Sequence, residues 1–136
     1  MRNARPARMS EQEGPIKGKR QAAIDGHYEI ARRAKEAGAD TVVICDTHWL
    51  VNAGFHVNAN DRFEGLLTSS EFPQFIRDLP YDHEGNPALG DAIAEAATDM
   101  GVYTLSHRLD SLDLEYGTLV PLQFMSRVHP MKVVSV

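Results

Sequence analysis

Asp46 and His48 stand one residue apart, directly after the apolar run Thr41–Cys45. The run has no polar alternation, which predicts a strand that is covered on both faces and central in a parallel sheet. Ligands of such sheets bind beyond the carboxyl ends of the strands, where loops meet on a rigid scaffold. His48 could therefore bind a metal ion, with Asp46 orienting it. A loop histidine held by ordinary hydrogen bonds explains the same pattern, so both interpretations stay open.

Two further histidines lie on or beside predicted strands. His107 follows an apolar run at its carboxyl end, and His56 lies on the alternating segment Phe55–Ala59. Either side chain could face a substrate or support a ligand, and a histidine hydrogen-bonded within the scaffold is the competing interpretation. Trp49 is expected in a pocket wall or in the core. The remaining histidines are expected on the surface or on helices: His27, His83 and His129.

The helices that must position these residues follow from apolar spacing and from end signals. Apolar residues at helical spacing predict helices over about 22–37, 87–100 and 119–125. Asn86 followed by Pro87 is a typical helix start. Gly38 and Gly101 are expected just past the ends of the first two helices.

Strands are predicted over 41–45, 55–59, 102–105 and 131–136. Residues 60–72 are expected to be mostly connection, and Pro73 is expected to open a short helix that Pro80 ends. The order indicates an α/β fold with a mostly parallel central sheet flanked by helices. Because the last strand is apolar with nothing after it to cover its second face, we expect an incomplete domain.

Composition excludes several classes of protein. The 136 residues, 43% of them hydrophobic, can bury one core. The net charge of −5 is spread without a basic stripe, which argues against nucleic acid as a partner. No apolar run reaches the ~20 residues that cross a bilayer, so no membrane partner is expected. The single cysteine, Cys45, cannot form an internal disulfide, which fits a cytoplasmic protein.

Several collinear segments resemble the amino-terminal part of the class III extradiol ring-cleaving dioxygenases, in the branch that acts on 3,4-dihydroxyphenylacetate (homoprotocatechuate). The resemblance implies that residues 10–136 are the amino-terminal part of the catalytic domain of such an enzyme, and that residues 1–9 are disordered or atypical. It implies a cytoplasmic enzyme of 4-hydroxyphenylacetate degradation, homo-oligomeric at full length. The matching segments are Arg20–His27, Asp46–Asn52, Phe55–Asn58, Leu67–Asp78, Gly85–Gly90, Leu114–Pro121 and Lys132–Val136.

The resemblance implies meta cleavage of a catechol by O2 at a non-haem Fe(II) held by two histidines and one glutamate. Three ligands on one face leave three positions open, enough for both catechol oxygens and for dioxygen. His48 matches the second histidine ligand. Tyr116 falls where the wider superfamily has a histidine that faces the substrate, and its phenol could hydrogen-bond a substrate oxygen. Packing at a loop and helix junction is the alternative for Tyr116.

The sequence departs from the family pattern at the first ligand. No histidine precedes His27, and Arg2–Arg8 occupies the place of the first histidine. A guanidinium stays protonated and has no lone pair for Fe(II). The family's glutamate ligand and its catalytic acid/base histidine lie beyond Val136, so no catalytic residue is assigned in this chain. We therefore expect the chain alone neither to bind iron tightly nor to cleave catechols.

Two alternatives remain at this point. A non-catalytic relative or partner subunit of the same fold, which has lost metal ligands, would also lack the first histidine. A metal-dependent hydrolase that uses Asp46 and His48 has no nucleophile motif and no second ligand cluster in its favour.

Overall fold

The computed structural model describes residues 18–71, 73–74 and 76–136. The atypical segment expected over residues 1–9 lies outside them. The elements are, in chain order, α1 (Gln21–Glu36), β1 (Thr41–Ile44), β2 (Phe55–Asn58), β3 (Arg62–Leu67), β4 (Leu79–Glu84), α2 (Pro87–Asp99), β5 (Thr104–His107), α3 (Tyr116–Met125) and β6 (Lys132–Ser135).

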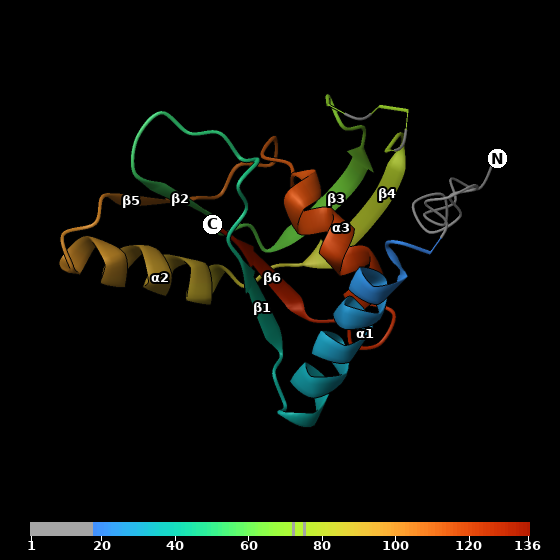
Figure 1. Ribbon diagram of the computed structural model, residues 1–136. Helices are drawn as coiled ribbons and strands as arrows, with labels where there is room; N and C mark the ends of the chain where they lie inside the picture. Colours follow the sequence, from blue (N-terminus) through green and yellow to red (C-terminus); the bar gives the residue numbers. More distant parts are fainter. Residues whose placement is uncertain (1–17, 72, 75) are drawn as a thin grey trace.

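The main sheet has four strands in the order β1-β6-β2-β5. β1 pairs with β6 in parallel, and β2 pairs with β5 in parallel. Between the two pairs there is a single antiparallel contact, Asn58 with Ser135, and each of these residues ends its strand. The two parallel pairs therefore run toward each other, and their carboxyl ends meet near the middle of the molecule (Figure 1).

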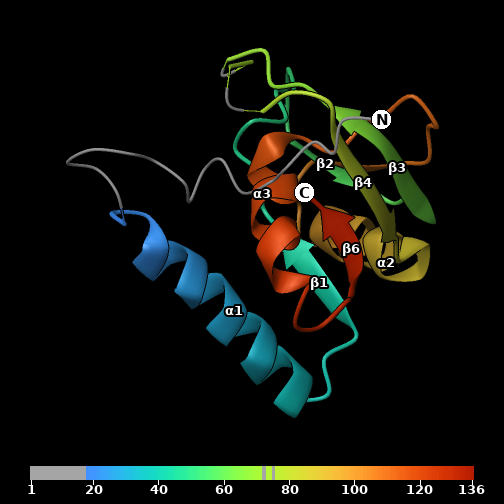
Figure 2. The same cartoon turned by 90° about the vertical axis from the view of Figure 1, so that its right-hand side faces the viewer.

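Helices cover both faces of this sheet, as expected for an α/β fold (Figure 2). On one face, Ala94 of α2 packs against Val57 and Val134. On the other face, α1 and α3 lie side by side, and buried Ala31 of α1 packs with Met125 of α3. The prediction of a mostly parallel sheet flanked by helices is confirmed. In the described part of the chain, no helix is long and apolar enough to cross a membrane.

The predicted helix ends are also confirmed. The side chain of Asn86 accepts a hydrogen bond from the amide of Leu89 at 3.1 Å, and Pro87 is the first residue of α2. Gly38 and Gly101 follow their helices with φ of 72° and 82°, a conformation that residues with a Cβ rarely adopt.

Three sequence expectations need correction. β1 is an edge strand of the described sheet, with β6 inside it, and Val43 is 44% exposed. A continuous apolar run indicates coverage, but strand order depends on pairing between distant segments. β5 begins at Thr104, two residues later than predicted, because Val102 and Tyr103 belong to the connection after α2. The helix predicted from Leu119 begins at Tyr116.

The segment expected to be connection is instead an antiparallel hairpin of β3 and β4. Phe63 and Leu67 are buried in the core cluster that also contains Leu119 and Val133. The described residues between the strands form turns and bends, where a short helix was expected. Pro80 lies inside β4, which a two-stranded sheet tolerates because each strand has an open edge.

Candidate functional site

Asp46 fixes the start of the loop after β1. Its backbone amide donates to the carbonyl of Val136, with 2.7 Å between N and O. Its Oδ1 accepts the amide N–H of His48 at 2.8 Å, and its Oδ2 accepts the hydroxyl of Thr118 at 2.7 Å. Thr118 is buried and also contacts the hydroxyl of Ser135 at 3.2 Å. Asp46 thus connects the end of β1 with β6 and α3.

The carboxylate of Asp46 lies against the first turn of α3. A Cβ on Gly117 would overlap Oδ1 of Asp46 and stand 2.9 Å from its Cγ, so glycine lets the helix approach this closely. A helix amino terminus carries partial positive charge and favours a carboxylate there. Gly117 therefore allows the Asp46 carboxylate to lie at the start of α3 while it accepts the hydrogen bond from the amide of His48.

The imidazole of His48 contacts Tyr116 and Glu71. The Tyr116 hydroxyl donates to Oε2 of Glu71 at 3.0 Å and lies 2.9 Å from Nδ1 and 2.8 Å from Nε2 of His48. The nitrogens of an imidazole point in different directions in the ring plane, so one oxygen near both lies over the ring, which agrees with the tilt of 35° between the rings. The side chain of His48 is 36% exposed. A carboxylate, a phenol and an imidazole therefore meet at the protein surface.

Burial and neighbouring acids raise the pKa of two groups of this site. Loss of solvent raises the pKa of Tyr116, and its hydrogen bond to Glu71 raises it further. Loss of solvent also raises the pKa of Glu115, with the charge of Asp46 adding to the effect. The phenol of Tyr116 therefore remains a hydrogen-bond donor at neutral pH.

A second group of side chains gathers around Trp49. The rings of His56 and His107 lie nearly in one plane, with 4.8 Å between centroids and 13° between planes, and Nδ1 of His56 is 2.7 Å from Nε2 of His107. The ring of Trp49 is roughly perpendicular to both, with its centroid 6.0 Å from that of His56 and 6.2 Å from that of His107. Trp49 follows His48 directly, so the loop after β1 joins the two groups.

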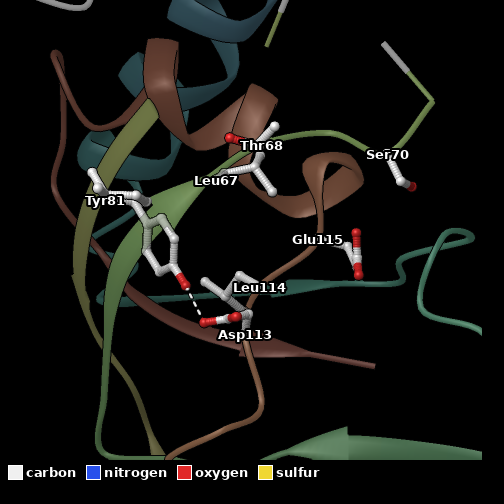
Figure 3. A pocket seen from close by; sticks show the side chains of 8 residues that line it. Leu67, Thr68, Ser70, Tyr81, Asp113, Leu114 and Glu115 are labelled. Atoms are coloured by element: carbon white, nitrogen blue, oxygen red, sulfur yellow. Dashed lines mark hydrogen bonds between the residues drawn. The ribbon is translucent and has the colours of Figure 1, made fainter. Parts of the chain in front are cut away.

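A pocket of about 220 Å³ adjoins the His48 group. Figure 3 shows Tyr81 of β4 pointing at Asp113, which accepts its hydroxyl at 2.7 Å. Leu114 lies between them and Glu115, the residue before Tyr116, and the hydroxyls of Thr68 and Ser70 complete a polar rim. The lining carries two acids and no base, so it suits hydroxyl groups better than anions.

The structure brings together three of the residues singled out from the sequence: Asp46, His48 and Tyr116. His56 and His107 contact each other, and their contact with the first group runs through Trp49. Sequence reasoning missed Glu71 and Thr118. The hydroxyl of Thr118 was a weak signal, because it lies near a predicted helix start. Glu71 gave no signal, because an acidic residue in a loop is common.

Fe(II) accepts imidazole and carboxylate ligands, and His48 and Glu71 offer one of each, with 3.8 Å between Nδ1 and Oε1. Within residues 18–71, 73–74 and 76–136, no group of three histidine, cysteine or acidic side chains could hold a metal ion. The described residues therefore fit part of a facial triad and do not complete one.

Comparison with known proteins gives two matches. A curated relative from Escherichia coli, 3,4-dihydroxyphenylacetate 2,3-dioxygenase, is 51% identical over 128 residues. The match covers 94% of this chain and 46% of the relative, so the chain spans about half the relative's length. The sequence model of one family, the catalytic LigB subunit of aromatic ring-opening dioxygenase, matches residues 5–136. The chain therefore belongs to the LigB family of aromatic ring-opening dioxygenases.

Proposed function

We propose that residues 10–136 form the amino-terminal part of an Fe(II)-dependent extradiol dioxygenase that opens the ring of 3,4-dihydroxyphenylacetate or a similar catechol. The observation that carries the proposal is the position of His48 beyond the carboxyl end of β1, with its amide held by Asp46 and its ring exposed beside Glu71. The E. coli relative, whose name states this reaction, supports the choice of substrate.

In this proposal His48 is one ligand of the iron, Glu71 stays its neighbour, and the other ligands come from outside the described residues. Fe(II), when bound, supplies electronic coupling between the catechol and dioxygen. The carboxylate of Asp46 fixes the loop, and the phenol of Tyr116 lies where it can donate to a catechol oxygen at neutral pH. Asp113 and Glu115 repel the carboxylate of an arylacetate, so the catechol hydroxyls are the end of the substrate that suits their pocket.

The location, the degradative route and the oligomeric state follow from the same proposal. We place the enzyme in the cytoplasm and in the degradation of 4-hydroxyphenylacetate, as a homo-oligomer at full length. An exposed free thiol at Cys45 is compatible with a reducing compartment.

A chimera tests the proposed function. Residues 18–136 replace the matching segment of the E. coli relative, whose own flanking segments remain and supply their ligands. The purified chimera is given Fe(II), 3,4-dihydroxyphenylacetate and air. The proposal predicts a yellow ring-cleavage product from the chimera and none from its His48→Gln variant. A folded chimera that binds iron without cleaving the substrate would contradict the proposed activity.

A non-catalytic relative is the second candidate, because no histidine precedes His27. That candidate predicts that even the 18–136 chimera is inactive, since the described residues would have lost their fit to a catechol. A second chimera that carries residues 1–136 isolates the effect of the arginine-bearing segment. Activity in the first chimera alone would place the defect in residues 1–17 and support a catalytic role for the remainder.

A further inference from the structure

The hydrogen bonds of His56 and His107 fix which ring nitrogens carry protons. Nε2 of His56 lies 3.2 Å from the carbonyl of Ala53, and a carbonyl only accepts, so this nitrogen donates. In a neutral ring Nδ1 of His56 is then the acceptor, and it lies 2.7 Å from Nε2 of His107. His107 therefore donates to His56, and His56 donates to Ala53, in one directed chain.

The hydrogen-bonded pair of His56 and His107 contacts the side chain of Trp49. His56 lies on β2 and His107 ends β5, so the two rings stand on a paired, rigid part of the sheet. The ring of Trp49 contacts both imidazoles and is roughly perpendicular to each of them. Leu50, the next residue, is 91% exposed and adds no packing. The two imidazoles thus connect the loop tip with the sheet.

Few charges act on this pair. Arg108 follows His107 but forms an ion pair with Asp91 of α2. In the described part of the chain, no carboxylate forms an ion pair with either ring, and the elements that pack on the rings present Trp49 and the Ala53 carbonyl. Burial lowers the pKa of His107, and the neighbouring His56 lowers it further. The surroundings therefore favour a pair that is not doubly charged.

We propose that the His56–His107 pair is a proton-sensitive support for Trp49, which holds the loop bearing His48 in place when the pair is neutral and releases it when both rings are protonated. Double protonation sets an N–H of His107 against an N–H of His56 and places two positive charges in adjoining rings. The two rings must then separate, and Trp49 loses its contacts with them. The proposal concerns the loop's position and does not depend on whether the chain takes part in ring cleavage.

The fluorescence of Trp49 tests this directly, because Trp49 is the single tryptophan of the chain. Emission and acrylamide quenching are recorded from about pH 8 downward, with far-UV circular dichroism at each pH. We expect a red shift and stronger quenching with a midpoint below about pH 6.5, the ordinary value for histidine, while the circular dichroism stays constant. A constant emission over the range in which the fold persists would overturn the proposal.

Variants assign the transition to the pair. His107→Gln keeps a side-chain donor but cannot titrate, so its emission should stay at the high-pH value. His83→Gln is the matched control, because burial also lowers the pKa of His83 on β4, and it should keep the transition. A transition that survives in His107→Gln and is lost in His48→Gln would overturn the proposal.

Nitrogen-15 NMR of the unaltered chain provides a measurement that needs no variant. Above the midpoint both rings should be neutral with the proton on Nε2, as the directed hydrogen bonds require. A proton on Nδ1 of His56 in the neutral pair would contradict the proposed arrangement.

Discussion

The carboxylate of Asp46 accepts a hydrogen bond from the hydroxyl of Thr118, with 2.7 Å between Oδ2 and Oγ1. The two residues are far apart in the sequence, and Thr118 is fully buried. This contact joins the loop that bears His48 to the first turn of α3. The position of His48 therefore depends on a helix that follows much later in the chain.

Removing the Asp46 carboxylate should destabilise the protein. Asp46→Ala leaves the amide of His48 and the hydroxyl of Thr118 without this acceptor, and bonds to a charged group contribute about 1.5–3 kcal/mol. We expect a loss of that size in the free energy of unfolding measured with urea. Asp61→Ala, at an exposed position, should change it by less than about 0.5 kcal/mol. Equal losses in the two variants would contradict the role of Asp46.

Gly117→Ala should destabilise the protein although alanine favours helices. The new Cβ would overlap the Asp46 carboxylate, and overpacking of this kind costs about 1–3 kcal/mol. Gly26→Ala is the matched control, because a Cβ on Gly26 in α1 meets nothing within 4 Å. It should gain up to about 1 kcal/mol from helix propensity. If both variants were stabilised alike in urea unfolding, the close approach of α3 to Asp46 would be wrong.

Local signals predicted the helices well. The start of α2 depends on Asn86 and Pro87, which are neighbours in the sequence, and its end depends on Gly101. Such end signals act within one turn, so all of their parts lie close together in the sequence. The same holds for the apolar spacing of α1.

Pairing between distant segments was harder to predict. The hairpin strand β3 does alternate in burial, but Gly65 carries no side chain to mark the inner face and Leu66 is 68% exposed. Its partner β4 contains Pro80, which was interpreted as the end of a short helix. The edge position of β1 likewise depends on β6, which follows some 90 residues later by the numbering of the two strands.

The site was predicted in part for the same reason. His48 and Asp46 directly follow a strand, and this position identified them as candidates from the sequence. Glu71 contacts His48 because the hairpin of β3 and β4 places their connecting loop beside His48. The sequence of that loop contains no signal from which this contact could be predicted. The contact between His56 and His107 required the pairing of β2 with β5.

Tyr116→Phe should impair the site without unfolding the protein. The hydroxyl contacts His48 and Glu71 at the surface, and residues that support a metal ligand typically change affinity or activity by about 10–100-fold when they are lost. In the 18–136 chimera we expect a loss of ring-cleavage activity in that range, with unchanged circular dichroism. Tyr103→Phe, at a position that is 60% exposed, should keep full activity. Full activity of Tyr116→Phe would remove Tyr116 from the site.

Stability should fall as the pH falls through the range in which His83 and His107 titrate. Burial lowers the pKa of both residues in the folded state, so the unfolded chain binds protons first. Their contribution is therefore complete above about pH 6.5 and is lost as the pH falls through the lower folded values. Urea unfolding at several pH values should show this loss, and His83→Gln should show a smaller one. Stability that rises over this range on acidification would contradict the burial of these rings.

The iron content of the 18–136 chimera tests most directly whether His48 is a metal ligand. Chimeras with His48 intact, with His48→Gln and with His27→Gln on α1 are purified identically, supplied with Fe(II) under anaerobic conditions, and analysed for iron per polypeptide. We expect near-stoichiometric iron in the first and third proteins and only background iron in His48→Gln. Stoichiometric iron in a folded His48→Gln chimera would contradict the assignment of His48 as a ligand.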